Sequence, residues 1–304
     1  MSEKKFSAIG VLFAVTATLI WSGNYIVARY VKADISPVGL AFLRWACASI
    51  IMLLLSFRNI KKDYPVFVQK RTYFFWASLC GITLFNTLLY HASHFTIATN
   101  VALISTTLTA LFSIALAVIF TKEKLSIAKS IGIFICVIGI WILQMRENWS
   151  TPFAFRFHDG DIWLVAAAVC FAVYNLLIKK RPATMSTNSF LFFTFMFGTC
   201  MLLPFFLLEI ITKQNAITWS WSLAGMVMYI GAGASVISFF CWNKAIEKMG
   251  ISHTALFGNL IPVFSMIEAL LLLGEEITKW HILGAVCIIA GIIITHLKKA
   301  NTAL

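Results

Sequence analysis

The chain has 304 residues, of which 60% are hydrophobic and 12% are charged, and its formal net charge is +12. A soluble domain carries about a quarter charged residues, so the composition excludes an ordinary soluble protein and predicts a surface that mostly faces lipid. The basic excess does not indicate a nucleic-acid partner, because the lysines and arginines gather at the ends of apolar segments and follow a membrane topology.

Ten apolar segments follow one another with short connections, and each is long enough to cross the hydrocarbon core of a bilayer as a helix. They cover residues 7–28, 37–57, 72–94, 98–121, 128–145, 161–178, 188–211, 222–244, 252–273 and 279–297. The alternation of period two that is typical of membrane β-barrels is absent from the sequence. We therefore expect an all-α integral membrane protein with ten transmembrane helices.

The distribution of cations predicts the orientation of these spans. Of the 24 lysine and arginine residues, 17 fall in inner segments and 6 in outer ones when the N-terminus is placed in the cytoplasm, and Arg44 lies inside a span. Lysine and arginine resist translocation, so both termini are expected in the cytoplasm and the protein in the inner (plasma) membrane. The seven cysteines all lie within spans and form no CxxC pair, so we expect neither disulfides nor metal chemistry from them.

The two halves of the chain resemble each other. Residues 10–29 and 160–179 both begin with glycine, carry an aromatic residue next to an asparagine and end on a cation, and residues 98–126 resemble residues 251–278. Each half contains five spans, an odd number, so the halves must enter the bilayer from opposite faces. Inverted repeats of this kind are typical of secondary transporters, with the binding site where the repeats meet.

The repeat predicts the domain organisation. Residues 1–145 are expected to form a first repeat of five transmembrane helices, and residues 161–304 a second one, with the two repeats around a central cavity. Residues 146–160 are polar, aromatic and proline-containing, and they are predicted to form a periplasmic linker.

Several loose motifs occur in a characteristic order. They are Trp21-Ser-Gly-Asn, Pro37 followed by Arg44, the link from Ala92 to Ala102, Glu123-Lys-Leu-Ser and Gly274-Glu-Glu-Ile-Thr. In these features the chain resembles ten-helix members of the drug/metabolite transporter superfamily, in its EamA-like branch, over nearly its whole length. The resemblance implies two pseudo-symmetric bundles, alternating access, and export or uptake of small organic metabolites. The family's proline in the fourth span is Thr109 here, whereas the ninth span keeps Pro262, so we expect a bend or break in the second half only.

Two charged residues lie within spans, where a charge costs about 2.5–3.5 kcal/mol on insertion scales. Arg44 lies about 10 Å below the outer end of its span, and Glu268 lies at a similar depth in the ninth. The equal depth permits an ion pair between them. Two interpretations stay open: Arg44 anchors a substrate carboxylate and Glu268 is a proton-coupling group, or both are structural or reach the interface with their side chains.

Polar and aromatic residues within the spans are the candidates for substrate binding. They are Trp21, Asn24, Tyr25, Arg44, Asn86, Tyr90, Tyr174, Asn175, Trp242, Asn243 and Asn259. The Asn24–Tyr25 and Tyr174–Asn175 pairs correspond in the repeat, so inverted symmetry predicts that both lie near the central cavity. The alternative is that these side chains only hold helices together by hydrogen bonds.

No catalytic constellation is visible in the sequence: there is no phosphate-binding loop, no HExxH and no GxSxG. His91 and His94 form an HxxH pair, but no nearby ligand completes a metal site, so we expect neither metal nor cofactor, and a pH-sensitive gate is the other interpretation of the pair. The sequence predicts a secondary transporter of a small polar metabolite, amino-acid-like by the family resemblance, acting as an exporter, with protons as the candidate coupling ion. The alternatives are an uptake system, a broad efflux carrier for amphipathic, aromatic or cationic compounds, and a lipid-acting membrane enzyme.

Overall fold

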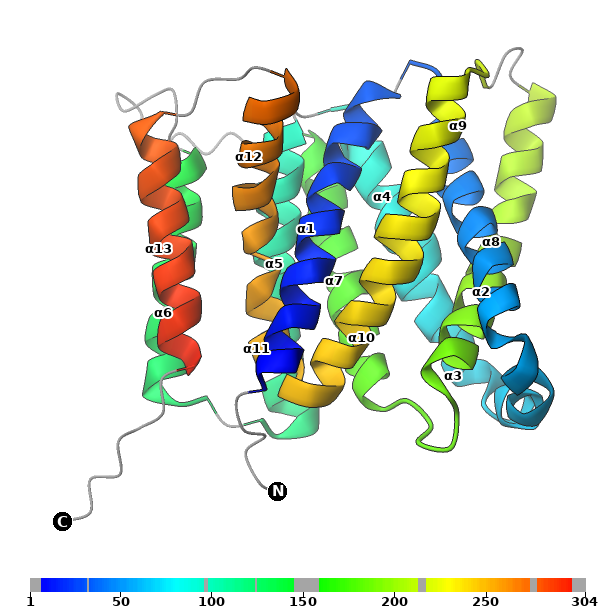
Figure 1. Cartoon of the computed structure of the whole chain (residues 1–304), viewed down its shortest axis with the longest axis horizontal. Coiled ribbons are helices and arrows are strands. Elements are labelled where there is room, and N and C mark those ends of the chain that lie inside the picture. Colours follow the sequence, from blue (N-terminus) through cyan, green and yellow to red (C-terminus); the bar gives the residue numbers. More distant parts are fainter. Residues whose placement is uncertain are drawn as a thin grey trace.

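The computed structural model describes residues 7–31, 33–95, 98–123, 125–144, 159–212, 217–273 and 278–296. These residues are almost entirely helical (Figure 1). Strand-like pairing within the described ranges is limited to one isolated antiparallel bridge between Ile35 and Ile217. The predicted all-α class is confirmed.

The helices are α1 (Ala8–Tyr30), α2 (Pro37–Gln69), α3 (Arg71–Ser78), η1 (Leu79–Leu84), α4 (Phe85–Ala92), α5 (Ala98–Thr121), α6 (Ile127–Gln144), α7 (Asp159–Lys179), α8 (Thr187–Thr212), α9 (Trp221–Met228), η2 (Tyr229–Ile237), α10 (Ser238–Met249), α11 (Ile251–Phe257), α12 (Leu260–Leu273) and α13 (Lys279–His296). Here η1 and η2 are π-helical turns inside otherwise continuous helices, so α3–η1–α4 is the third predicted span and α9–η2–α10 the eighth. The ninth span is α11 followed by α12. Within the described ranges, seven segments are long and apolar enough to cross a membrane, and residues 127–142 and 279–295 form shorter apolar helices.

The two halves run in opposite directions through the molecule. In Figure 1, α1 rises from the lower edge to the upper edge, whereas its counterpart α7 descends from the upper edge. Contacts between helices follow the same symmetry: α5 packs on α7 as α12 packs on α1, and α4 packs on α7 as α10 packs on α1. The pairs α2–α8 and α6–α13 each join equivalent helices. The chain therefore folds as two inverted five-helix repeats.

Glycines permit the close approach of α6 and α13. A Cβ on Gly132 would lie 2.5 Å from the Gly291 carbonyl oxygen, and a Cβ on Gly291 would lie 2.6 Å from the Gly132 carbonyl oxygen. Gly139 meets the carbonyl of Gly284 at 2.8 Å in the same way. Backbones in such direct contact leave no room for a side chain, as is common where membrane helices pack through small residues.

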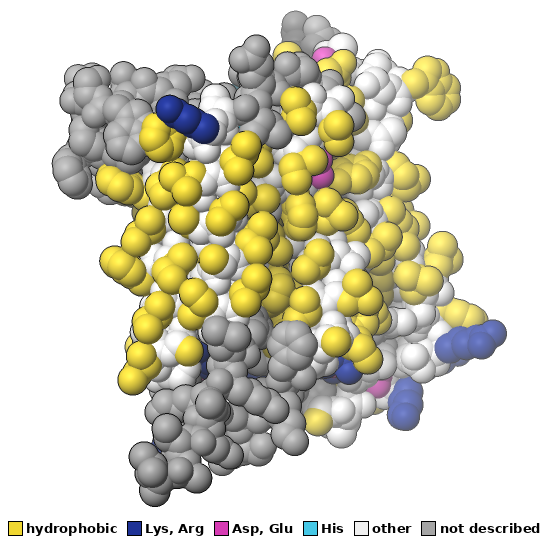
Figure 2. Space-filling view, turned by 60° about the vertical axis from the view of Figure 1, so that its left-hand side comes forward, with side chains coloured by type: hydrophobic (Ala, Val, Ile, Leu, Met, Phe, Trp, Pro, Cys, Tyr) yellow, Lys and Arg dark blue, Asp and Glu magenta, His cyan; other side chains and the backbone are white. Residues whose placement is uncertain are grey.

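The outer surface suits a lipid environment. Figure 2 shows hydrophobic side chains spread over the middle of one face, with Lys and Arg side chains near its upper and lower edges. Large apolar side chains such as Leu54, Ile211 and Leu271 are more than two-thirds exposed. Exposed apolar area of this extent is stable only when something other than water covers it, which agrees with a multi-pass membrane protein.

Helix α2 is longer than the sequence predicted. Residues 58–69 carry several lysines and arginines and were expected to form a loop, but the helix continues through them to Gln69. Tertiary contacts explain the extension, because Asp63 is 3% exposed and accepts hydrogen bonds from the Ser186 backbone N–H (3.3 Å) and hydroxyl (3.0 Å). A charged segment can remain helical when the polar groups on its buried face have hydrogen-bond partners of this kind.

Helices α2 and α8 are joined at both edges through their N-cap serines. Each serine caps its own helix and also bonds to a carboxylate of the other helix. Ser36 accepts the Gly39 N–H at the start of α2 (2.9 Å), and its hydroxyl donates to the Glu209 carboxylate of α8. At the other edge Ser186 accepts the Ser189 N–H (3.1 Å) and its hydroxyl donates to Asp63 of α2. The two serines are 150 residues apart, so the repeat reproduces one capping device at both faces of the membrane.

A third carboxylate joins the two repeats at the lower edge. Glu123, just after α5, accepts the backbone N–H groups of Ile251 (3.1 Å) and Ser252 (3.2 Å) and the Ser252 hydroxyl (2.7 Å) at the start of α11. Burial opposes the charged form, but these hydrogen bonds and the charge of Lys179 hold the pKa of the Glu123 carboxyl below its usual value. Gly250 precedes α11 with φ +88°, a conformation that favours glycine.

We expect Ser36→Ala and Ser186→Ala each to lower the free energy of unfolding by about 1–2 kcal/mol, because each removes an N-cap bond together with a bond to a partner helix. Ser220→Ala is the matched control, since Ser220 caps α9 through the Leu223 N–H (3.0 Å) with no carboxylate bonded to it among the described residues. Thermal unfolding in detergent measures all three. Equal losses in the three variants would show that the contacts between helices add nothing.

The Glu123 contact should weaken in acid. The folded-state pKa lies below the usual value of about 4.3, so the carboxylate stabilises the fold at neutral pH, and this contribution is lost as the pH falls through the folded-state pKa. Glu123→Gln should therefore lower the unfolding temperature at neutral pH, and the difference from the unchanged protein should shrink towards acidic pH. Parallel pH curves for the two proteins would contradict this assignment.

Candidate functional site

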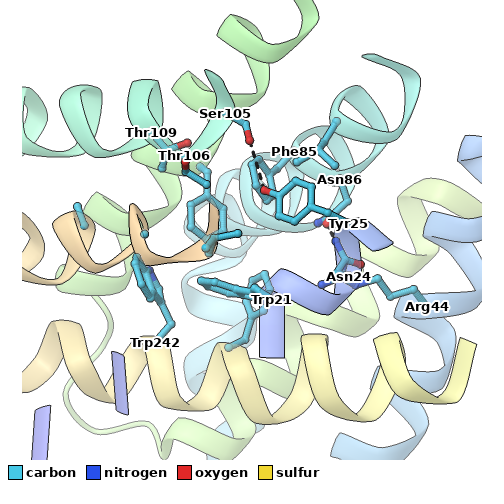
Figure 3. A pocket seen from close by; sticks show the side chains of 16 residues that line it. Trp21, Asn24, Tyr25, Arg44, Phe85, Asn86, Ser105, Thr106, Thr109 and Trp242 are labelled. Atoms are coloured by element: carbon cyan, nitrogen blue, oxygen red, sulfur yellow. Dashed lines mark hydrogen bonds between the residues drawn. The ribbon is translucent and has the colours of Figure 1, made fainter. Parts of the chain in front are cut away.

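A central cavity of about 560 Å³, counting the space at its open side, lies between the two repeats (Figure 3). Helices α1, α2, α4 and α5 of the first repeat and α7, α10, α11 and α12 of the second all contribute to its wall. The lining residues are Trp21, Asn24, Tyr25, Arg44, Phe85, Asn86, Leu89, Ser105, Thr106, Thr109, Phe171, Phe239, Trp242, Ala255, Gly258 and Ile261. A cavity lined by both inverted repeats is where this architecture places its substrate.

Arg44 forms the charged end of the cavity and is 1% exposed. Its Nη1 donates to the side-chain oxygens of Asn24 (3.0 Å), Asn86 (2.9 Å) and Tyr90 (2.8 Å). Its Nε donates to the Ser235 hydroxyl at 2.6 Å. All of these partners are neutral, so the guanidinium is well bonded while its charge is not balanced.

The π-helical turn η2 supplies a further acceptor to this network. The carbonyl oxygen of Ala234 accepts from Arg44 Nη2 (3.0 Å) and from the Trp21 indole N–H (2.7 Å). A π-helical turn changes the regular hydrogen bonding of its helix and is frequent at functional sites. The turn η1 begins 150 residues earlier, so both repeats carry the irregularity at the same place.

Aromatic rings form the other end of the cavity. The ring centroid of Trp21 lies 5.7 Å from that of Phe171, 5.5 Å from that of Phe239 and 5.0 Å from that of Trp242. Edge-to-face and tilted contacts at these distances are favourable. Behind this wall the Trp242 indole N–H donates to Asn175 (2.8 Å), and the Asn175 amide donates to Ser113 of α5 (2.9 Å).

The ninth span is interrupted beside the cavity. Helix α11 ends at Phe257, α12 begins at Leu260, and Pro262 follows in its first turn. Proline has no N–H to continue the regular ladder of hydrogen bonds, and Gly258 lines the cavity at the break. Helix α5, which has Thr109 at the family's proline position, is continuous. The expectation of a break in the second half only is confirmed.

The ion pair permitted by the sequence does not form. No salt bridge joins Arg44 to Glu268, although both lie in described segments; Glu268 instead has its Oε1 2.6 Å from the Ser22 hydroxyl of α1, while its Oε2 is buried without a partner. Equal depth does not bring two residues together, because Arg44 points into the cavity and Glu268 lies in the contact between α12 and α1. The sequence left this pairing open, and the structure shows each side chain with other partners.

The structure gathers about half of the predicted substrate-binding residues around the cavity. Trp21, Asn24, Tyr25, Arg44, Asn86 and Trp242 line it, whereas Tyr90, Tyr174, Asn175, Asn243 and Asn259 do not. Of the second group, Tyr90 bonds to Arg44 and Asn175 bonds to Trp242.

The repeat-related pairs therefore have different surroundings. Tyr25 faces the cavity and lies 3.3 Å from the Ser105 hydroxyl. Tyr174 is fully buried against η1, where a Cβ on Gly81 would come within 2.3 Å of its ring. The second pair does not line the cavity but contacts its lining: the ring centroid of Tyr174 lies 5.6 Å from that of Phe171, and Asn175 accepts from Trp242.

Sequence reasoning missed the apolar part of the lining. Phe85, Phe171 and Phe239 carry no polar group and were not distinguished from the other phenylalanines. The repeat held a usable signal, because Phe171 lies 150 residues after Trp21 and occupies the equivalent position.

No group of three or more His, Cys, Asp and Glu side chains is arranged to hold a metal ion in the part of the chain that the structure describes. The His91 ring packs edge-on against Phe95 and Trp163 at 5.1 and 5.2 Å.

Comparison with known proteins agrees with this architecture. The sequence pattern of the EamA-like transporter family matches residues 8–145 and again residues 158–297. The "Uncharacterized transporter YetK" of Bacillus subtilis is 26% identical over 300 residues, covering 96% of this chain and 88% of that protein. The "Probable amino-acid metabolite efflux pump" of Escherichia coli is 24% identical over 302 residues, covering 94% of this chain and 93% of that protein.

A protein of known crystal structure superposes with a TM-score of 0.73 at 17% identity, covering 94% of this chain and 95% of that one. This likeness shows a shared fold. With the family pattern matched in both halves, the chain belongs to the EamA-like transporter family, within the drug/metabolite transporter superfamily.

Proposed function

We propose that this transporter exports a small amino-acid-like metabolite across the inner membrane by alternating access, without a catalytic step. The observation that carries the proposal is the guanidinium of Arg44, which lies in a cavity shared by two inverted repeats and whose hydrogen-bond partners among the described residues include no carboxylate. A carboxylate on the substrate would supply the missing charge through charge-assisted hydrogen bonds. Relatives named as amino-acid metabolite efflux pumps support the choice of substrate class and of direction.

The proposed orientation places the lower edge of Figure 1 in the cytoplasm. Helix α1 begins and α13 ends at that edge, Arg58 and Lys62 lie in the C-terminal part of α2, and Lys180 follows α7. Cations retained on the cytoplasmic side support this choice. Residues 1–145 and 161–304 are then the two repeats, and the proposed periplasmic linker at residues 146–160 lies mostly outside the described residues.

A broad efflux carrier for aromatic or amphipathic compounds is the second candidate. The observation that favours it is the aromatic wall of Trp21, Phe171, Phe239 and Trp242, which offers ring faces and few polar groups. Cationic compounds fit this candidate poorly, because Arg44 would repel them at the other end of the cavity.

Proteoliposome flux tests the proposal. Purified protein should give saturable, concentrative flux of at least one labelled amino-acid-like compound, and Arg44→Gln should reduce kcat/KM at least about 100-fold, since a charge-assisted hydrogen bond in a buried site is worth about 3 kcal/mol. Arg58→Gln, which removes an exposed arginine at the lower edge, is the matched control and should leave flux unchanged.

Three other results would contradict the proposal. Flux that does not saturate would indicate a channel, and flux of dyes alone would favour broad efflux. Conversion of lipid without flux would indicate an enzyme.

We also propose protons as the coupling ion, with Glu268 as the group that binds them. Its carboxyl bonds to Ser22, the neighbour of the cavity residue Trp21 on α1, so a change in its charge acts on a helix that also lines the cavity. Ionisable side chains inside the membrane commonly mark proton relays.

Glu268→Gln should abolish uphill flux driven by a pH gradient while leaving exchange of substrate between the two sides intact, because the amide keeps a bond to Ser22 and cannot titrate. Glu247→Gln, at the lower edge in a salt bridge with Arg181 (2.5 Å), is the control. Unchanged dependence on pH in Glu268→Gln would remove Glu268 from the mechanism.

A further inference from the structure

Compounds of the same shape can differ in charge, and the net charge of the cavity discriminates between them. Among the described residues that line it, Arg44 is the only charged one, so this lining contributes one positive charge. Of the described acids, Glu268 bonds to Ser22 and Glu123 bonds to the start of α11, and neither of them lines the cavity. A monoanion neutralises the cavity, a zwitterion leaves its charge at one, and a cation raises it to two.

The same end of the cavity has hydrogen-bond donors to spare. Nη2 of Arg44 donates one bond, to Ala234, so its second hydrogen remains for another acceptor. Asn86 is 2% exposed and turns its Oδ1 towards Arg44, and its buried Nδ2 has no partner. Flipping the side-chain amide of Asn86 would place its N–H groups against the N–H groups of the guanidinium. The hydrogen bond to Arg44 therefore fixes which way the Asn86 amide points. The guanidinium and the amide together form a seat for one carboxylate group.

The aromatic rings at the other end offer no hydrogen-bond acceptor that would replace the hydration of an ammonium group lying on them, although the hydroxyls of Thr106 and Thr109 also line the cavity. The indole N–H groups of Trp21 and Trp242 are already donated to Ala234 and Asn175, so both side chains present only their rings. A cation lying on such rings gains about 0.5–2 kcal/mol, whereas removing an ion from water costs several kcal/mol. The larger cost decides against a free ammonium at this end.

From these contacts we propose that the cavity selects organic monoanions, in which one carboxylate is attached to a flat or apolar body that carries no free ammonium, such as N-acylated amino acids or arylalkanoic acids. The inference rests on the proposed function in taking this cavity as the transport site, and it narrows the substrate from amino-acid-like solutes in general to those of net negative charge. The carboxylate lies on Arg44 and Asn86, and the body lies against Trp21, Phe171 and Trp242.

Three compounds with one body and three charges test the selection directly. Phenylalanine, N-acetylphenylalanine and phenylalaninamide are titrated calorimetrically into the full-length protein in detergent, and the series is repeated with the leucine and tryptophan analogues. The dissociation constant of the N-acetyl anion should be at least tenfold lower than that of the zwitterion in at least one series, and the amide cation should bind most weakly. No saturable binding of any of the three anions would overturn the proposal, and so would tighter binding of the zwitterion or the cation.

Asn86→Asp is a control of nearly identical shape that adds one negative charge to the cavity. The new carboxylate beside Arg44 makes the cavity neutral and occupies the guanidinium, so the preference for the anion should fall at least tenfold and the zwitterion should become the tighter ligand. Arg44→Lys keeps the charge and should keep the order of the three compounds at weaker affinity. An unchanged order in Asn86→Asp would overturn the assignment of the seat even if every variant is folded.

The flux assay distinguishes the two levels of the argument. Saturable flux of free amino acids with equal binding of all three charge forms would overturn the anion selection and leave the proposed transport intact. Absence of flux for both amino acids and their N-acyl derivatives would overturn the proposed function itself.

Discussion

A guanidinium buried inside a membrane needs hydrogen-bond acceptors for its N–H groups. Regular helices provide few of them, because their backbone carbonyl groups already accept hydrogen bonds within the helix. Arg44 obtains them from side chains of α1 and α4 and from the Ala234 carbonyl of η2. The five acceptors come from three helices other than α2, so the position of one cation fixes how α1, α2, α4 and η2 meet. The π-helical turn in the eighth span has a physical reason in this requirement, since it brings one carbonyl within reach of both Arg44 and Trp21.

The two inverted repeats share one arrangement of helices, and sequence differences between them determine which end of the cavity is charged and which is aromatic. The residue 150 positions after Arg44 is Thr194, which is fully buried and donates to the Phe190 carbonyl at 2.7 Å. The residue equivalent to Trp21 is Phe171, which retains its place in the wall. The first repeat therefore supplies the charged end, and both repeats supply the aromatic end. A symmetric pair of charged ends would have doubled the cost of burial and left no apolar surface for a substrate body.

Ten spans, their inversion and the break before Pro262 could be predicted because hydrophobic length, charge bias and proline act locally along the chain. The extent of α2 could not be predicted, since the residues beyond 57 are charged and only the bond from Ser186 to Asp63 shows why they stay helical. Whether Arg44 and Glu268 form an ion pair could not be predicted for a related reason. Sequence spacing gives the depth of a residue in the bilayer, whereas partnership also depends on the rotation of each helix.

The cavity shows the same limit at the level of single residues. Polar side chains inside spans were candidates for substrate binding because each needs a hydrogen-bond partner inside the membrane. That partner can lie within the protein behind the cavity wall as well as at the cavity surface. Asn24 and Asn175 are both asparagines in the corresponding spans of their repeats. Asn24 reaches the cavity, and Asn175 lies behind it as the support of Trp242.

The carboxylates of Asp63, Glu209 and Glu123 restrict the movements of the helices in different ways. The reciprocal bonds of Ser36 with Glu209 and of Ser186 with Asp63 join α2 and α8 at both edges, so these two helices can move as one unit without losing either cap. Glu123 joins α5 to α11, one helix from each repeat, at the lower edge. Any conformation that separates α5 from α11 at this edge must give up three hydrogen bonds to one carboxylate. Opening the cavity there by that movement therefore requires water or another acceptor to take over the first N–H groups of α11.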